Sequence, residues 1–390
     1  MVKDLNQSTR GFALRWVVCA VGLAGVVGAF LFVQREHDRH GAPGGQPAQV
    51  KTAHPAAPDV ETAQSVRKMD EQRLAEDIDR VLKSVAAGEN VSAEDLRSVI
   101  AVSERLRGPD DASLGPLFTA LAAKQRDAGE TAEAEVHLRR AMTVSEQACG
   151  LESPDVAAPL RLLVPLLAEA GRLDEALPLA RRALNIHEKT VGLESIEAAE
   201  DRNTLGLILR AAGQRAEAES TLRRAVGIVQ EKFGTEDIRL GHYLHSLALV
   251  YQDAGRLDEA ESTLRRAVEI GENTYTPDQP DTCAWRATLA RVLHVRGNLE
   301  EAERLYRRNV TLAEERGATD EAARVMPLNN LAILLYDTHR LPEAQRTAQH
   351  AVEIATRTLG EGSPQTRVCA QTLRSITEAL VPPIETPPPR

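Results

Sequence analysis

The sequence predicts an all-α protein built from a repeated pair of helices, and three observations support this. Ala, Leu, Glu and Arg dominate its 390 residues and aromatics make up only 3%, a composition typical of closely packed helices. The alternation of β-branched and aromatic residues that marks strands is nearly absent. The motif "AGRLDEAESTLRRAVEI" at 254–270 follows "AGQRAEAESTLRRAVGI" at a distance of forty-two residues. A stacked array of helical repeats explains all three features.

The first element is an apolar segment, "WVVCAVGLAGVVGAFLFV", which spans 16–33 without a charge. A bilayer-spanning helix needs about 17–25 residues, whereas the apolar core of a cleaved secretory signal has about 7–15. We therefore predict a tail over 1–15 and an uncleaved single-pass transmembrane helix over 16–33. Signal cleavage is the alternative. Lys and Arg are nearly balanced on the two sides, with a slight preference for a cytoplasmic N-terminus and an extracytoplasmic repeat domain.

Two further segments precede the repeats. Residues 34–62 include a run rich in Pro, Gly, Ala and Gln, which is typical of a flexible tether. Residues 63–110 carry apolar side chains near helical spacing. We expect a pair of helices there, with Ser92 as the N-cap of the second.

The repeats share a fixed sequence pattern. A glycine recurs every forty-two residues, and five positions after it stands an alanine that follows a glutamate; His339 takes the sixth glycine place. We predict six units with a lone closing helix over 363–380 and a Pro-rich tail over 381–390. The units are 111–152, 153–194, 195–236, 237–278, 279–320 and 321–362.

Within one unit, Leu205, Gly206, Leu209, Gly213 and Ala218 match the small and apolar positions of a helix–turn–helix hairpin, and this pattern resembles the tetratricopeptide repeat. Units of that family have about 34 residues. The extra residues here fall in linkers such as "CGLESPDVA", as in repeats of the kinesin-light-chain type. The resemblance implies an α-solenoid, a right-handed superhelix whose concave face is lined by the first helix of each unit. Where Thr276 and Ala318 replace the linker glycine, we expect departures.

Composition disfavours several classes of function. The formal net charge of −10 opposes nucleic-acid binding. No small-molecule substrate or cofactor is implied. The four cysteines have no CxxC or CxxH spacing, and we expect small buried side chains without a disulfide framework or a metal site. They are Cys19, Cys149, Cys283 and Cys369.

The charged side chains of the repeated motif are predicted to have a structural role rather than a catalytic one. In four units a glutamate precedes an arginine by four residues, which places both side chains on one face of the second helix. A carboxylate pair for acid–base chemistry is expected once in a pocket, not in every repeat. No P-loop, GxSxG or HExxH motif occurs, so we expect no enzymatic activity. The pairs are Glu135–Arg139, Glu219–Arg223, Glu261–Arg265 and Glu303–Arg307.

The preceding helices carry the candidate binding residues. The tetratricopeptide resemblance implies that a recurring stripe on each first helix faces a groove for peptides, and that basic side chains there favour carboxylates. Asn203 and Asn329 occupy equivalent places and are predicted to bracket a peptide backbone. The stripe comprises Arg161, Asn203, Arg210, His242, His245, Gln252, Arg291, His294, Asn329 and Tyr336.

The sequence thus predicts a membrane-anchored scaffold or adaptor that binds protein or peptide partners along its concave face. A secreted form of the same module and a regulatory or sensory subunit of a larger complex are alternatives. An enzyme with an unrecognised site is the least favoured.

Overall fold

The structure is a computed structural model that describes residues 72–81, 83–84, 87, 91–274, 279–315 and 317–380. Every regular element within these ranges is helical. The predicted transmembrane helix, the tether and the Pro-rich tail lie outside them. Of the helices in the described ranges, none combines the length and the apolar character that a membrane span requires.

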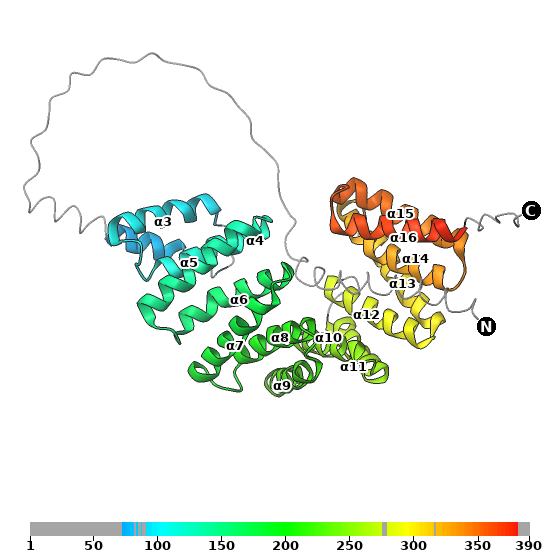
Figure 1. Cartoon of the computed structure of the whole chain (residues 1–390), viewed down its shortest axis with the longest axis horizontal. Coiled ribbons are helices and arrows are strands. Elements are labelled where there is room, and N and C mark those ends of the chain that lie inside the picture. The colour runs from blue at the N-terminus through cyan, green and yellow to red at the C-terminus, as the bar shows by residue number, and fades with distance from the viewer. Residues whose placement is uncertain are drawn as a thin grey trace, which may run out of the picture. The chain divides into compact units, whose positions relative to one another are not determined.

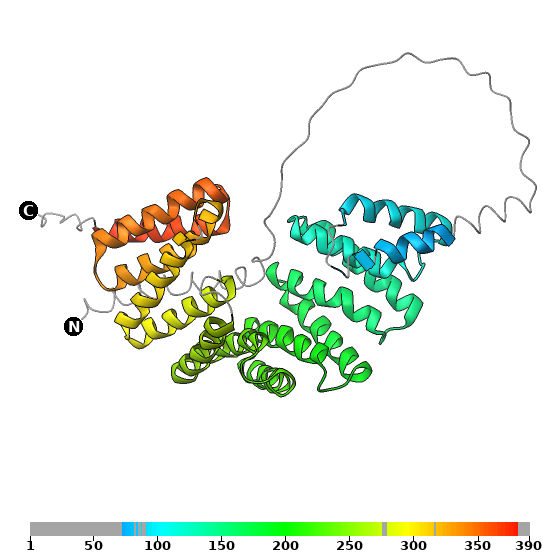
Figure 2. The same ribbon diagram turned by 180° about the vertical axis from the view of Figure 1, so that it is seen from behind.

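The chain divides between Thr190 and Val191 into two compact units, and each is described by itself. Paired helices stack along each of them (Figures 1 and 2). Residues 72–81 are helical and belong to the N-terminal unit. The further helices of that unit are α3 (Ala93–Arg107), α4 (Leu114–Asp127), α5 (Thr131–Cys149), α6 (Pro154–Glu169) and α7 (Leu173–Thr190).

The C-terminal unit continues the pattern of alternating first and second helices. Its last helix packs against α15 and α14. The elements are α8 (Ile196–Ala211), α9 (Arg215–Phe233), α10 (Ile238–Asp253), α11 (Leu257–Thr274), α12 (Pro280–Arg296), α13 (Leu299–Glu315), the 3-10 helix η1 (Gly317–Arg324), α14 (Val325–Asp337), α15 (Leu341–Leu359) and α16 (Pro364–Leu380).

The helix ends have local causes that are visible in the sequence. The Ser153 side chain accepts a hydrogen bond from the backbone N–H of Asp155, with Pro154 at the first helical position. The turn residue Gly255 has φ +74°, a conformation that costs glycine nothing. The Arg256 N–H then donates to the Tyr251 carbonyl over 2.9 Å. This tight turn sends the second helix back along the first.

Small side chains set the distance between the two helices of a hairpin. Ala218 and Ala260 are fully buried. A Cβ atom added at Gly206 would lie 2.5 Å from Cγ of Leu222 on the second helix, so a larger residue there would have to separate the helices. The alanines and this glycine therefore allow close packing, as the repeat pattern predicts.

First and second helices differ in how they meet their counterparts in the next repeat. In the C-terminal unit, successive first helices α8, α10, α12, α14 and α16 contact one another. Among the described residues of either unit, successive second helices stay more than 8 Å apart between Cα atoms. Since each hairpin is splayed in this way, the first helices form the inner face of the curved stack within a unit.

The linker at position 318 and the cysteines depart from the regular pattern of the repeats. The position of Ala318 lies in η1, a 3-10 helix between α13 and α14; residue 276 lies outside the described residues. The prediction of buried cysteines is wrong for Cys149, which is exposed because it is the last residue of α5, where the chain leaves the core. Cys369 is buried and Cys283 half-buried, while Cys19 is outside the described residues.

Candidate functional site

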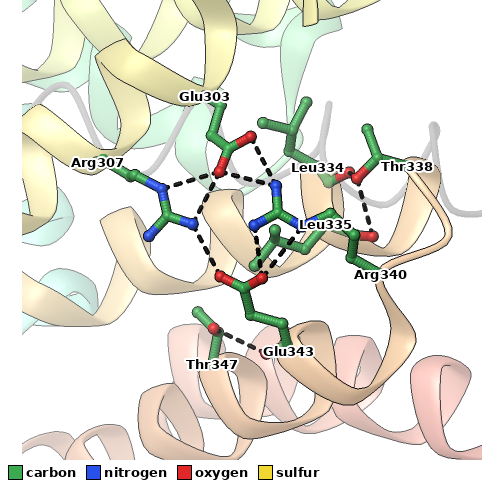
Figure 3. A network of polar contacts seen from close by, with 8 residues as sticks. All are labelled: Glu303, Arg307, Leu334, Leu335, Thr338, Arg340, Glu343 and Thr347. Atoms are coloured by element: carbon green, nitrogen blue, oxygen red, sulfur yellow. Dashed lines mark hydrogen bonds and ion pairs between the residues drawn. The ribbon is translucent and has the colours of Figure 1, made fainter. Parts of the chain in front are cut away.

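The charges of the repeated motif form closed rings on the second-helix side. In Figure 3, Glu303 and Arg307 of α13 face Arg340 and Glu343 of the next hairpin. Arg307 donates to Glu303 over 2.9 Å and to Glu343 over 2.8 Å. Arg340 also contacts both carboxylates, at 2.8 Å to Glu303 and 2.5 Å to Glu343. Each of the four side chains therefore has two partners of opposite charge.

All four predicted i,i+4 pairs are present. The structure adds that the long side chains bridge successive second helices, which the backbone alone leaves apart. Burial by itself would raise the pKa of Glu303, but hydrogen bonds from Arg340 and Arg307 outweigh it and hold that pKa below its usual value. A general acid needs a raised pKa, so this shift argues against Glu303 as a general acid. The N-terminal unit holds the equivalent ring of Glu135, Arg139, Arg172 and Glu175.

The ten predicted binding residues lie on first helices and are called the first-helix stripe below. Arg161 is exposed on α6, in the N-terminal unit. The other nine belong to α8, α10, α12 and α14 of the C-terminal unit. The structure therefore places these nine along one row of adjacent helices.

Buried His245 joins α10 to α12. Its Nε2 lies 3.0 Å from Oγ1 of Thr288, and that hydroxyl donates to the Ala284 carbonyl. Thr288 is consequently the acceptor, and the neutral His245 ring carries its proton on Nε2. Burial, and then the positive charges of Arg291 and Arg210, lower the pKa of His245 to about 3.

The other two histidines of the stripe face aspartates. His242 Nε2 lies 3.5 Å from Oδ2 of Asp281, and its ring meets Trp285 edge to face. His294 Nε2 lies 3.2 Å from Oδ2 of Asp337 on α14. His242 and His245 thus have different partners, and within the described ranges no group of three or more His, Cys, Asp or Glu side chains is arranged to hold a metal ion.

Two arginines of the stripe differ in their partners. Arg210 on α8 donates from Nε to Oδ2 of Asp253 on α10 over 2.6 Å. Arg291 on α12 donates from Nη2 to the neutral amide oxygen of Gln252 over 2.8 Å. Arg210 is therefore neutralised by a neighbour and Arg291 is not.

Several polar atoms of the stripe have no hydrogen-bond partner although they are buried. They are Oδ1 of Asn203, Nε of Arg291, and both Oδ1 and Nδ2 of Asn329, a residue only 1% exposed. Buried polar groups are normally paired. The stripe thus keeps donors and acceptors that the described part of the fold does not use.

The sequence reasoning missed the residues that pair with the stripe. Asp253 and Asp337 each follow a stripe position directly and are eighty-four residues, or two repeats, apart. This equivalence between repeats could have identified both aspartates as partners of the stripe. Arg286 was also missed, although Arg202 stands two repeats before it. Arg286 is buried and bound to Glu272 and Asn309 at 2.7 Å each.

Comparison with known protein families finds matches within the repeats. Models described as "Tetratricopeptide repeat" match residues 155–231 and 239–315, and 126–155 and 328–365. A search of curated proteins finds no match.

Among solved structures, the chain is similar to a putative kinesin light chain with nearly identical TPR-like repeats from Podosopora anserina (24% identity, 53% of this chain and 97% of that chain, TM-score 0.48). It is also similar to BtubC from P. vanneervenii (22%, 62% and 92%, 0.48). A third is PilW, a type IV pilus biogenesis factor (14%, 66% and 98%, 0.47).

Proposed function

This chain belongs to the tetratricopeptide-repeat family, and on that premise we propose that it binds segments of partner proteins along the first-helix stripe. The observation that carries the proposal is the set of unused hydrogen-bonding atoms on α8, α12 and α14. An amide side chain offers both donors and an acceptor, which match the alternating N–H and C=O groups of an extended peptide. Asn203 and Asn329 supply such amides on two first helices.

The rings on the second helices support the same assignment by contrast. Their carboxylates and guanidinium groups already satisfy one another. A partner that displaced them would have to replace several charge-assisted hydrogen bonds. The first-helix stripe carries no such cost at its unpartnered atoms, so it is the favoured surface for a partner.

The proposal is tested by selecting peptides from a random displayed library on the purified full-length chain. Replacing Arg161, Arg210 and Arg291 together by Glu should weaken the selected peptides at least tenfold, about 1.4 kcal/mol. A matched triple, Arg215→Glu, Arg308→Glu and Arg346→Glu, changes the same charge at exposed positions of second helices and should leave affinity within twofold. Failure to select any peptide, or equal losses in both triples, would contradict the proposed function.

We further propose that residues 16–33 anchor the chain in a membrane, with the N-terminus cytoplasmic and the repeats on the other side. The support is the uncharged apolar run in the sequence. Intact-mass measurement of the protein extracted from membranes should show an uncleaved N-terminus. Protease added to sealed cells or vesicles of known orientation should digest the repeats from the extracytoplasmic side. A mature N-terminus beyond residue 33 would instead support the secreted alternative.

A further inference from the structure

Thr372, on the closing helix α16, carries a buried hydroxyl that has no bonding partner. The residue is only 5% exposed, and among the described residues its side chain makes no hydrogen bond. The two other threonines of α16 donate to backbone carbonyls, Thr366 to Gly360 and Thr377 to Leu373, over 2.8 Å each. Because buried polar groups are normally paired, Thr372 is an exception within its own helix.

An equally unbonded amide occupies the matching place on the neighbouring first helix. Asn329 of α14 is 1% exposed, and neither its Oδ1 nor its Nδ2 has a hydrogen-bond partner. It stands forty-three residues before Thr372, and α14 contacts α16 directly. The same spacing separates His245 from Thr288, which meet at 3.0 Å between α10 and α12. The repeat therefore places Asn329 and Thr372 in the register of a bond that forms elsewhere in the row.

The bonded pair shows what the unbonded pair would need in order to close. Thr288 donates its hydroxyl proton to the carbonyl four residues before it and accepts from His245. A helical threonine divides between two χ1 rotamers, because its hydroxyl can bond such a carbonyl. Turning Thr372 in this way directs its proton at the Val368 carbonyl and leaves its oxygen to accept from Nδ2 of Asn329. Closing the pair therefore takes this rotation and a small approach of α16 to α14.

The surroundings of α16 leave room for that approach. Its buried face packs on α15 and α14, at the end of the stack (Figure 1). In contrast, α12 is held between two second helices, α11 and α13. The stripe opposite the buried face of α16 is exposed and consists of Arg367, Gln371, Arg374 and Glu378. Since no helix in the described ranges covers this stripe, α16 can shift without disturbing the repeats.

We propose that Asn329 and Thr372 form a latch between α14 and α16. The structure describes its open state; in its closed state the Asn329 amide donates to the Thr372 hydroxyl. The first-helix stripe offers the same amide to a partner, so a bound peptide and the closed latch exclude each other. The latch thus restrains binding at this end of the stripe. This competition rests on the proposed function, whereas the latch itself rests only on the fold.

Hydrogen–deuterium exchange of the α16 amides in the full-length chain tests the latch without a partner. Thr372→Val and Asn329→Ala should each speed this exchange about threefold, since one neutral hydrogen bond shifts such an equilibrium by about two- to tenfold. If the two residues bond each other, the double variant should exchange no faster than either single variant. Thr377→Val, on the exposed side of α16, is the matched control and should exchange like wild type. Effects that multiply in the double variant, or unchanged exchange in both single variants, would overturn the latch.

The competition is tested with peptides selected on the wild-type chain that lose affinity on Asn329→Ala. They should bind Thr372→Val about threefold more tightly, because a site that is open in about one third of the molecules gains that factor when it is always open. Thr372→Ser keeps the hydroxyl and should keep the wild-type affinity. Unchanged affinity in Thr372→Val would overturn the competition and leave the proposed function standing. Failure to select any peptide would contradict the proposed function, while the exchange measurement still decides on the latch.

Discussion

The two faces of the C-terminal unit differ in how completely their polar side chains are paired. On the second-helix face the backbones lie apart, and long Glu and Arg side chains bridge them, as in the ring of Figure 3, where each charge has two opposite partners. On the first-helix face the helices touch, yet Asn203, Arg291 and Asn329 keep polar atoms unpaired. The charges of the outer ring thus satisfy one another, while some polar atoms of the inner face keep unused bonding capacity. Under the proposed function, the unpaired buried atoms rather than the abundance of charge mark the surface that a partner would use.

The largest difference in stability is expected between variants of two buried asparagines, one paired and one unpaired. Asn309 on α13 accepts from Arg286 over 2.7 Å and donates to the Cys283 carbonyl over 2.8 Å. Asn309→Ala leaves a buried guanidinium without this acceptor, so it should lower the free energy of unfolding by about 2–3 kcal/mol. Asn329 is equally buried but unpaired. Asn329→Ala should therefore stay within about 1 kcal/mol of wild type.

Urea unfolding of the full-length chain, followed by circular dichroism, measures both variants. A large loss in Asn329→Ala would mean that its amide has a structural partner after all. In that case the unpaired-atom criterion for the first-helix stripe would fail.

The hairpins were predictable because their causes are local. Gly255 makes the turn, Ala260 allows the close approach and Ser153 caps a helix, each within a few residues. The division between Thr190 and Val191 was not predicted from the uniform period. The sequence does differ near this division. Leu177 and Gln214 occupy the positions that hold a glutamate and an arginine in the charged ring of the preceding repeat.

The site was predictable only in outline. The stripe positions follow from the repeat, but which arginine stays unpaired depends on side chains about forty residues away. Asp253 is forty-three residues after Arg210, and Gln252 is thirty-nine before Arg291. These partners vary between repeats, so spacing alone could not separate a neutralised arginine from a free one.

A second prediction concerns pH and the buried His245. Its pKa is lowered from 6.5 to about 3, so the unfolded chain binds a proton that the folded chain does not between these values. Stability from this group is complete above pH 6.5 and is lost as pH falls toward 3. Between pH 7.5 and 5.5 the loss should be about 1.4 kcal/mol, from RT ln(1 + 10) at one unit below the unfolded pKa.

The measurement compares urea unfolding at the two pH values in wild type, His245→Gln and His242→Gln. The first variant should lose about 1.4 kcal/mol less than wild type on acidification. The second removes a histidine from the exposed side of the same helix and should keep the wild-type drop. Equal pH dependence in all three proteins would show that His245 gains a proton in the folded state near its usual pKa.

The smallest effect is expected on the outer face, where Glu303→Gln removes the charge that two arginines share. Its side chain is 24% exposed, and partly exposed ion pairs contribute only about 0.2–1 kcal/mol each. We expect a loss of about 1 kcal/mol in dilute buffer that shrinks in 1 M NaCl, because salt screens these charges. Glu300→Gln, at an exposed position of the same helix, should change stability by less than about 0.5 kcal/mol. A salt-independent loss in Glu303→Gln would indicate packing rather than charge, and the outer rings would then lose their role as the electrostatic counterpart of the inner face.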